Sequence, residues 1–347
     1  MNGNSMRAAI WEGPNLVRIA DAPRPALRAG ESLVHVELTG LCGTDFSILH
    51  GTHPRAAAPL IPGHEVTGRV VSGDDPELHG RRVAVLPLLS CGTCTPCRDG
   101  LAHVCERLGL YGIDEPGGLA EFAAFPHDRL FPVDDAVPVR TAALIEPLAV
   151  AVHAVRRSGL TGGETVAVFG AGPIGILTAL VAQHYGARRI LVVEPGDDRR
   201  ALAETLGFET LPATDDAAEA IRAAIPGGAR IVFDSAAHPS VARQLPRAAA
   251  VRGTIVLVGV YKKPVGLDLQ AVTFTEQTLV GVRVYTTADF RDAVGLVESD
   301  ALGLERLPVS VYDLAETTQA FAEATSAGSA LKVLVAPDTV AAAEAQR

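Results

Sequence analysis

The sequence has few lysines and no long apolar run. Its 347 residues include 30 basic and 40 acidic side chains, for a formal net charge of −10, and the only lysines are Lys262, Lys263 and Lys332. Nucleic-acid binding requires clustered Lys and Arg against the phosphates, so the acidic balance argues against that class of partner. No apolar run approaches the roughly 20 residues that span a bilayer. The N-terminal residues lack a basic region followed by an apolar one, so we expect no signal peptide and no membrane association.

Cysteine is sparse and unevenly spread, which excludes a disulfide framework. The chain has five cysteines, and four of them, Cys91, Cys94, Cys97 and Cys105, stand close together. A disulfide-stapled domain would instead show an even number of cysteines distributed along the chain. We therefore expect reduced thiols in a cytoplasmic protein, where a cysteine cluster of this kind binds metal.

The spacing Cys-x2-Cys-x2-Cys-x7-Cys predicts a closed zinc site. Four sulfur atoms at this spacing can surround Zn²⁺ tetrahedrally, each at about 2.3 Å. No coordination position would remain open, so the site would be structural, in a lobe that covers about residues 88–108. An iron–sulfur cluster is the chemical alternative, because it also takes four thiolates.

The pattern of the chain changes near residue 148. Before it, Gly and Pro punctuate short β-like runs at 33–38, 66–71 and 82–86, which indicates an irregular β domain. After it, strands and helices alternate, which is typical of an α/β domain with a parallel sheet. The expected strands there are 165–169, 190–193, 230–233 and 254–260, and the expected helices are 148–157, 174–185 and 199–206. Two more helices, 288–299 and 314–325, and a strand at 332–335 follow from about residue 282.

A glycine fingerprint lies between the first expected strand of this α/β domain and its helix. Gly170, Gly172 and Gly175 form a G-x-G-x-x-G pattern, and the strand–turn–helix context is what identifies a dinucleotide site. The first glycine allows a tight turn, the second lets the backbone approach a pyrophosphate, and the third permits close helix–strand packing. Pro173 and Ile174 open the helix whose N-terminus would face the anion.

An acidic residue stands where the ribose of the cofactor would bind. Glu194 ends the next expected strand, 19 residues after Gly175. A carboxylate there accepts hydrogen bonds from the ribose hydroxyls and repels a 2′-phosphate, so we expect NAD rather than NADP. Arg199 and Arg200 follow closely. Because Arg can bind a 2′-phosphate, NADP remains the less favoured alternative cofactor.

A second set of metal-ligating residues is scattered through the N-terminal part. Cys42 lies in the stretch Gly-Leu-Cys-Gly-Thr-Asp, His64 and Glu65 lie in Pro-Gly-His-Glu-Val, and Glu146 precedes a proline. Each residue alone has an ordinary structural interpretation: a lone Cys is most often a small core residue, and a Glu suits the start of a helix. Their combination with a nicotinamide site makes them candidates for a metal centre.

Taken jointly, these motifs resemble the zinc-containing alcohol dehydrogenases of the medium-chain dehydrogenase/reductase superfamily. The resemblance covers nearly the whole chain, and Glu146-Pro147-Leu148-Ala149-Val150 is similar to the branch of sorbitol, butanediol and threonine dehydrogenases. It also extends to the dehydrogenases that oxidise aminocyclitols in aminoglycoside biosynthesis. The motifs that carry the resemblance are Cys42-Gly43-Thr44-Asp45, Gly63-His64-Glu65-x2-Gly68, the four-cysteine lobe, the Glu146 stretch and the glycine fingerprint.

The resemblance implies a two-domain α/β fold. A GroES-like irregular β domain, the catalytic one, would comprise residues 1–147 and 282–347 and carry the zinc lobe. A Rossmann domain with a doubly wound parallel sheet would comprise residues 148–281 and bind NAD. Beyond the fingerprint, the expected cofactor contacts are Arg199, Val258, Gly259, Val260 and Val282.

The resemblance also assigns the catalytic residues. A catalytic zinc would be held by Cys42 and His64, with Glu65 or Glu146 completing the set, and the hydroxyl of Thr44 would take the substrate proton. Many relatives carry a histidine three residues after this Thr, as the next member of the proton relay, but Ser47 stands here. His50, His53 or bulk water are the candidates for the exit of the proton.

The expected function is the NAD-dependent oxidation of a secondary alcohol on a polyol-like small molecule, in a homodimer or homotetramer. An amino alcohol, such as an aminocyclitol or a threonine-like substrate, is the first alternative. An alternative from another class is a non-catalytic nucleotide-binding protein. Such proteins usually lack the metal ligands, whereas Cys42, His64, Glu65 and Glu146 are all present here.

Overall fold

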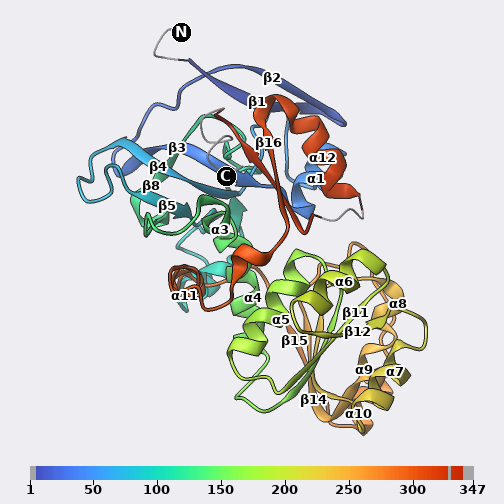
Figure 1. Cartoon of the computed structure of the whole chain (residues 1–347). Coiled ribbons are helices and arrows are strands. Elements are labelled where there is room, and N and C mark those ends of the chain that lie inside the picture. The colour runs from blue at the N-terminus through green and yellow to red at the C-terminus, as the bar shows by residue number, and fades with distance from the viewer. Residues whose placement is uncertain (1–4, 327–329, 339–347) are drawn as a thin grey trace. The chain divides into compact units, whose positions relative to one another are not determined.

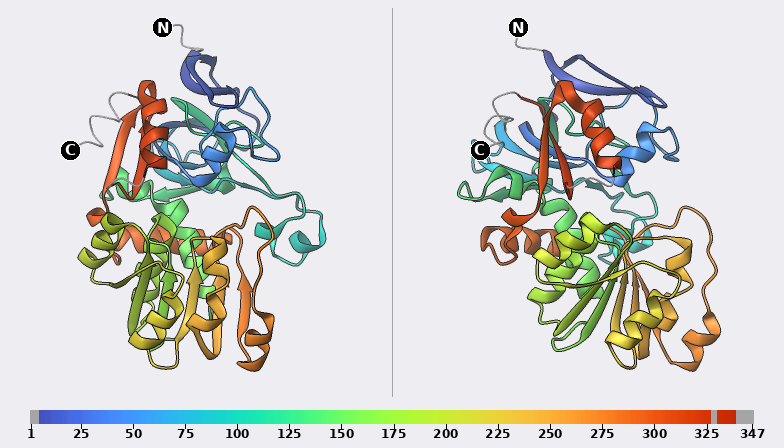
Figure 2. Two further views of the ribbon diagram at one scale, coloured as in Figure 1. Left: turned by 90° about the vertical axis from the view of Figure 1, so that its right-hand side faces the viewer. Right: turned by 45° about the vertical axis from the view of Figure 1, so that its right-hand side comes forward.

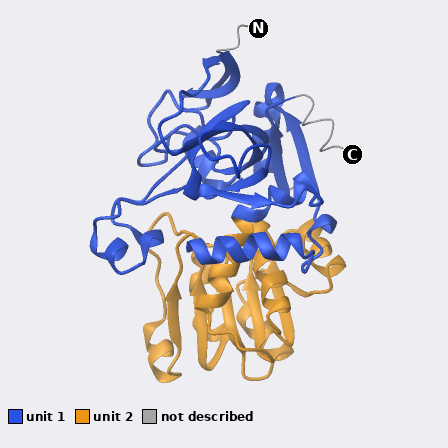
Figure 3. Cartoon of the chain, turned by 90° about the vertical axis from the view of Figure 1, so that its left-hand side faces the viewer, with its two compact units in different colours: residues 1–146, 286–347 blue, residues 147–285 orange. Residues whose placement is uncertain are grey.

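The computed structural model describes residues 5–326 and 330–338, which belong to two compact units (Figure 3). Unit 1 comprises Met1–Glu146 and Thr286–Arg347, and unit 2 comprises Pro147–Tyr285. No helix of the described residues is long and apolar enough to cross a membrane.

Unit 1 is built on a seven-stranded, mostly antiparallel sheet in the order β16-β17-β3-β4-β5-β9, with β8 also paired to β3 (Figure 1). Its central strand, β3, is buried along almost its whole length, and Val34 and Val36 pack with Phe125 in the core on one face. Among the described strands of this sheet, only β16 and β17 run parallel to each other. The strands are β3 (Glu31–Gly40), β4 (Glu65–Gly73), β5 (Arg82–Val85), β8 (Phe122–Pro126), β9 (Leu130–Val133), β16 (Val309–Asp313) and β17 (Lys332–Ala336).

Short elements surround this sheet. The hairpin of β1 (Ser5–Gly13) and β2 (Leu16–Pro23) precedes it, and helix α12 packs along β16 and β17 (Figures 1 and 2). The two-residue strands β6 (Leu88–Leu89) and β7 (Gly109–Leu110) pair with each other and close the base of the cysteine lobe. The other elements are α1 (Gly43–Leu49), α2 (Thr95–Arg98), η1 (Ala102–Val104), η2 (His127–Arg129), α3 (Val139–Ala142), α11 (Thr287–Glu298), η3 (Leu304–Arg306), η4 (Leu314–Glu316) and α12 (Thr317–Thr325).

Unit 2 is a parallel six-stranded sheet in the order β12-β11-β10-β13-β14-β15. The order reverses between β10 and β13, and such a switch point is where open α/β sheets bind their ligands. Its strands are β10 (Thr165–Phe169), β11 (Arg189–Glu194), β12 (Glu209–Pro212), β13 (Ala229–Asp234), β14 (Ala249–Leu257) and β15 (Thr278–Gly281). Its helices are α4 (Ile145–Arg157), which begins in unit 1, α5 (Pro173–His184), α6 (Asp197–Thr205), α7 (Ala217–Ala224), α8 (Pro239–Ala242), α9 (Leu245–Ala248) and α10 (Leu269–Phe274).

The predicted C-terminal end of one strand, expected over 254–260, is wrong. The apolar run to residue 260 predicts a strand through Val260, but β14 stops at Leu257. The amides of Val258 and Gly259 instead both donate to the carbonyl oxygen of Asp234, at 3.0 and 2.8 Å. The chain therefore turns across the end of β13, and Val260 is exposed.

Candidate functional site

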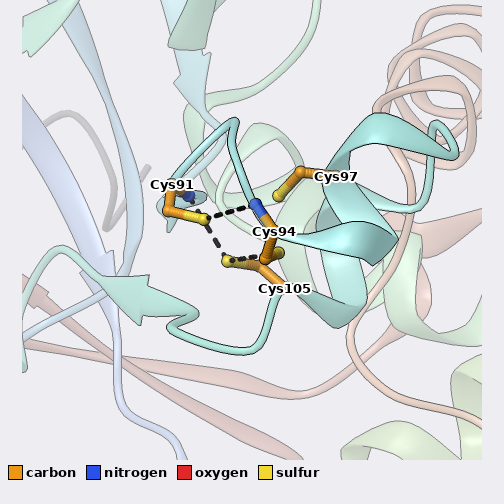
Figure 4. Close-up of side chains that lie close together, drawn as sticks. All are labelled: Cys91, Cys94, Cys97 and Cys105. Carbon is orange, nitrogen blue, oxygen red and sulfur yellow. Dashed lines mark hydrogen bonds between the residues drawn. The ribbon is translucent and has the colours of Figure 1, made fainter.

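The four cysteines of the lobe converge, as their spacing predicts. Their sulfur atoms lie within 4.8 Å of one another (Figure 4), and none of these cysteines forms a disulfide. Hydrogen bonds from Thr93 and from the amide of Cys94 lower the pKa of Cys91 to about 4, whereas burial and the neighbouring Cys94 raise that of Cys97 to about 12. Four sulfur atoms this close cannot all be thiolates unless a cation lies among them, so the donor set fits a metal ion.

The second cluster lies where two neighbouring strands of unit 1 meet. Cys42 follows β3 and caps the N-terminus of α1, while His64 and Glu65 stand at the start of β4. Because β3 and β4 are antiparallel and Gly40 is paired with Glu65, these segments lie side by side. Cys42, His64 and Glu65 each offer a ligand atom, and the three atoms lie within 4.8 Å of one another.

A buried aspartate orients this cluster. Oδ2 of Asp45 accepts a hydrogen bond from the amide of Cys42 at 2.9 Å, and its Oδ1 lies 3.7 Å from Nδ1 of His64. Burial alone would lower the pKa of His64, but Asp45 and Cys42 raise it well above 6.5. Since Nδ1 faces Asp45, Nε2 is the nitrogen left for a metal ion. The sequence motif contains Asp45, but sequence reasoning did not identify its role.

A buried lysine holds the third member of the cluster. Nζ of Lys332, on β17, lies 2.6 Å from Oε1 and 2.5 Å from Oε2 of Glu65. The two residues are only 5% and 1% exposed. Burial would lower the pKa of Lys332, but Glu65 and then Cys42 raise it, so the ammonium stays charged. Sequence reasoning missed this residue, although a lysine at the start of an apolar strand was a usable signal.

The remaining predicted catalytic residues lie around this cluster. Glu146 is buried in the first turn of α4 and does not belong to the group within 4.8 Å. Its charge still contributes to the raised pKa of Lys332, so it lies near the cluster. Thr44 is half-buried in the first turn of α1, two residues after Cys42. The roles of both residues remain predictions.

The glycine fingerprint forms the turn that a nucleotide cradle needs. Gly170 has a φ of +97°, and Gly172 caps helix α5, which Pro173 and Ile174 begin. A Cβ atom at Gly175 would lie 1.9 Å from the carbonyl oxygen of Gly170, so no other residue fits there. The first amides of a helix have no partner within it, so this N-terminus suits the binding of an anion.

Glu194 is tied to this turn. Its Oε2 accepts a hydrogen bond from the amide of Ala171 at 2.7 Å, and its Oε1 accepts one from the amide of Gly196 at 3.0 Å. Arg200 is held by the carbonyl oxygens of Glu194 and Pro195. The guanidinium of Arg199 instead lies close to Gly172, 3.3 Å from where a Cβ atom would stand.

The other predicted cofactor residues follow the ends of β14 and β15. The amide of Val282 donates to Leu257 at 3.2 Å, which places it beside the segment of Val258, Gly259 and Val260. Asp234 anchors the same region, because its Oδ2 accepts from the hydroxyl of Tyr261 at 2.6 Å and its Oδ1 from the amides of the loop after β13. Sequence reasoning did not foresee this Asp234–Tyr261 pair.

Comparisons with known proteins agree with this architecture. The family described as "Alcohol dehydrogenase GroES-like domain" matches residues 28–135, and the family "Zinc-binding dehydrogenase" matches residues 173–299. The chain is 36% identical to 2-dehydro-3-deoxy-L-galactonate 5-dehydrogenase of Pseudoalteromonas atlantica, over 95% of this chain and 98% of that one. It is 32% identical to L-galactonate-5-dehydrogenase of Escherichia coli K12, over 90% of this chain and 94% of that one.

Solved structures extend the likeness to cofactor-bound proteins. A short chain alcohol dehydrogenase from Escherichia coli CFT073 complexed with NADH superposes with a TM-score of 0.90 at 28% identity, covering 96% of this chain and 100% of that one. A protein from Sinorhizobium meliloti 1021, described as a zinc-binding dehydrogenase and bound to NADP, superposes with a TM-score of 0.89 at 30% identity. The match covers 96% of this chain and 99% of that one.

The fold and the motifs thus define a class, the two-domain dehydrogenases with a GroES-like and a Rossmann domain. Within that class, the chain belongs to the zinc-dependent alcohol dehydrogenase family of the medium-chain dehydrogenase/reductase superfamily. The predicted family, fold class and enzyme class are confirmed: it is a zinc-dependent oxidoreductase that uses a nicotinamide cofactor.

Proposed function

We propose that this enzyme oxidises a secondary alcohol of a polyhydroxylated small molecule, a polyol or sugar acid, with NAD as the hydride acceptor. The observation that carries the proposal is the cluster of the half-buried Cys42 and the buried His64 and Glu65 at the junction of β3 and β4. Relatives named for sugar-acid oxidation at carbon 5 support the substrate class. The carbinol carbon loses a hydride to NAD⁺ and the hydroxyl loses a proton, which leaves a ketone.

The donor set fits a catalytic zinc ion. One thiolate, one imidazole and one carboxylate suit zinc rather than magnesium, and three protein ligands leave a position for the substrate. We assign Glu65 rather than Glu146 as the carboxylate, because only Glu65 lies within 4.8 Å of the other two ligand atoms. Zinc bound there supplies a Lewis acid that polarises the substrate oxygen.

The surrounding side chains hold this set and handle the proton. The carboxylate of Asp45 lies 3.7 Å from Nδ1 of His64, which leaves Nε2 as the nitrogen for the metal ion. Lys332 fixes the carboxylate of Glu65 through both oxygens. We assign to the hydroxyl of Thr44 the proton that leaves the substrate alcohol, because Thr44 lies in the first turn of α1, two residues after Cys42.

NAD rather than NADP is the cofactor that Glu194 supports. Hydrogen bonds to Ala171 and Gly196 hold its carboxylate beside the fingerprint turn, where it would meet the ribose hydroxyls. A 2′-phosphate at that place would be repelled by the carboxylate.

A homo-oligomer in a reducing compartment completes the proposal. All five cysteines are free, which suits the cytoplasm. The edge strand β15 and helix α10 carry exposed apolar side chains that a second copy would cover.

Metal analysis combined with turnover assays tests the proposed function. We expect two zinc ions per chain and NADH formation with polyols or sugar acids. Cys42→Ser should remove one zinc ion and abolish turnover. Turnover confined to aminocyclitols or amino alcohols would favour the alternative substrate class, and no turnover on any alcohol would favour a non-catalytic nucleotide-binding protein.

A further inference from the structure

His53 belongs to a segment that folds back against helix α1. The amides of Thr52 and His53 both donate to the carbonyl oxygen of Ser47, at 2.8 and 3.0 Å. Ser47 lies one helical turn after Thr44, so the two residues share a face of α1. The imidazole of His53 is thereby placed beside the helix that carries the proposed proton acceptor.

Hydrogen bonds fix the tautomer of this imidazole. Its Nδ1 accepts from the amides of Ala56 at 3.2 Å and Arg55 at 3.4 Å. Nδ1 therefore carries a lone pair, and Nε2 carries the hydrogen. Burial and the charge of Arg55 lower the pKa of His53 below 6.5, so the ring is neutral at pH 7. Nε2–H has no hydrogen-bond partner among the described residues, and the ring is half-buried.

The segment that carries His53 is anchored on its far side, which holds the Nε2–H donor in a fixed direction. The guanidinium of Arg55 makes two hydrogen bonds of 3.0 Å to the carboxylate of Asp114. Asp114 in turn accepts from the amide of Leu110, on β7, at 2.9 Å. Ala56 packs against a buried cluster that includes Ile48 of α1. A ring held at Nδ1 by an anchored segment in this way loses little entropy when its Nε2–H binds a ligand.

His53 also lies within electrostatic reach of the candidate metal cluster. The charges of Asp45 and His64 both act on its pKa, the first raising it and the second lowering it. His50, the other histidine that follows α1, is exposed at the end of that helix.

We propose that His53 is a specificity-determining residue, whose Nε2–H donates a hydrogen bond to a substrate hydroxyl next to the reacting carbon. This inference rests on the proposed function and names the substrate feature that the site selects. A role as the missing relay base fits less well, because the only lone pair of the ring already accepts from Ala56. Protonation at Nδ1 would turn that hydrogen bond into a repulsion between two N–H groups.

The test compares a vicinal diol with the matching mono-alcohol, 2,3-butanediol with 2-butanol. His53→Leu should lower kcat/KM for the diol about tenfold, because one substrate hydroxyl is left without its partner. It should leave kcat/KM for 2-butanol and the zinc content unchanged. His53→Gln, whose amide can donate, should restore part of the loss. His79→Leu, in an exposed turn, is the control and should leave kcat/KM for both alcohols unchanged.

The possible outcomes separate the hypotheses. Equal losses of kcat on both alcohols, with a shifted pH profile, would indicate a relay base and overturn the inference, as would no loss on either. A wild-type enzyme inactive on every alcohol would overturn the proposed function, and this inference with it. The tautomer is checked without turnover: ¹⁵N NMR should show a hydrogen on Nε2 of His53, and a hydrogen on Nδ1 would contradict the geometry.

Discussion

At the scale of single residues, Gly40 shows how closely the candidate zinc cluster is packed. A Cβ atom there would lie 2.0 Å from Oε2 of Glu65 and 3.0 Å from Cε of Lys332. We expect Gly40→Ala to displace the carboxylate, and so to remove one of two zinc ions per chain and reduce kcat/KM by at least about 100-fold. Zinc content and NADH formation measure both effects. Gly295→Ala, with nothing within 4 Å of its Cβ, is the control that should keep both zinc ions.

Glu194 should decide between the two nicotinamide cofactors. Glu194→Ala removes the acceptor of the ribose hydroxyls and the charge that repels a 2′-phosphate. We expect KM for NAD to rise about tenfold and the preference for NAD over NADP to shrink by a similar factor. The guanidinium of Arg199 beside Gly172 would then favour NADP, so adding Arg199→Ala should remove the gain. An unchanged ratio of kcat/KM values for the two cofactors would contradict this assignment.

The residues predicted from sequence were those that stand in local motifs. Cys42, His64 and Glu65 converge as the family resemblance implies, although their role as ligands remains a prediction. Lys332 was missed because its partner Glu65 lies 267 positions away in sequence, and no local pattern records a pairing of β17 with β3. Pairings of this kind follow from the sheet, not from spacing along the chain.

At the scale of elements, the cysteine lobe should depend on its metal. The lobe rests on the two-residue pair of β6 and β7 and contains only short helices, so it has little core of its own. Cys97→Ser should lower Tm by several degrees and expose the stretch of 91–105 to proteolysis, because a structural zinc ion supplies the folding free energy. Limited proteolysis and calorimetry measure this.

The matched variant is Cys42→Ser. It should lose activity and one zinc ion while its lobe stays resistant to protease. Proteolysis of the lobe in both variants would show that the two sites are not independent, and proteolysis in neither would show that the lobe does not depend on its metal.

The loops after β13 and β14 predict a dependence on pH. Asp234 is buried, and burial raises its pKa despite the hydrogen bonds from Tyr261 and the amides of Ala237 and Ala236. A raised native pKa means that the folded state binds the proton more tightly than the unfolded state. The ionised carboxylate therefore costs stability at neutral pH, and this cost disappears as the pH falls through the native pKa.

Two variants separate the charge of Asp234 from its hydrogen bonds. Asp234→Asn keeps the shape of the side chain without its charge. The variant should therefore gain free energy of unfolding over the wild type near pH 7, and this gain should shrink as the pH falls toward about 4. Tyr261→Phe removes one hydrogen bond to a charged group and should cost about 2 kcal/mol. Urea unfolding at several pH values checks both, and a parallel pH profile for Asp234→Asn and wild type would contradict the raised pKa.

Buried strands were predictable and edge strands were not. The strand over 165–169 was found because a continuous apolar run suits a parallel strand with both faces covered. The edge strands β12 and β15 have mostly exposed or half-buried side chains, so neither periodicity nor an apolar run marks them. The end of β14 was placed three residues too far because Val258 and Val260 continue the apolar pattern after the backbone has turned toward Asp234.

At the scale of the whole molecule, β15 leaves one edge of the unit 2 sheet open. Among the described residues it pairs only with β14. Leu279 on this strand is 37% exposed, and Phe274 on the adjacent helix α10 is 78% exposed. An edge strand with apolar side chains would aggregate unless something covers it. A second copy related by a two-fold axis would present the same patch and cover both edges at once.

The mass in solution then depends on Leu279. We expect the wild type to have at least twice the chain mass of 36.1 kDa in light scattering, and Leu279→Lys to shift it toward the monomer, because a desolvated lysine at the centre of the contact costs several kcal/mol. Val71→Lys is the matched control, since Val71 is 40% exposed in unit 1 and should leave the mass unchanged. A wild-type monomer, or a Leu279→Lys variant that keeps the wild-type mass, would show that β15 is not the contact. An equal loss of mass in both variants would show that the effect of the lysine is not specific to β15, and so would not support this edge as the contact.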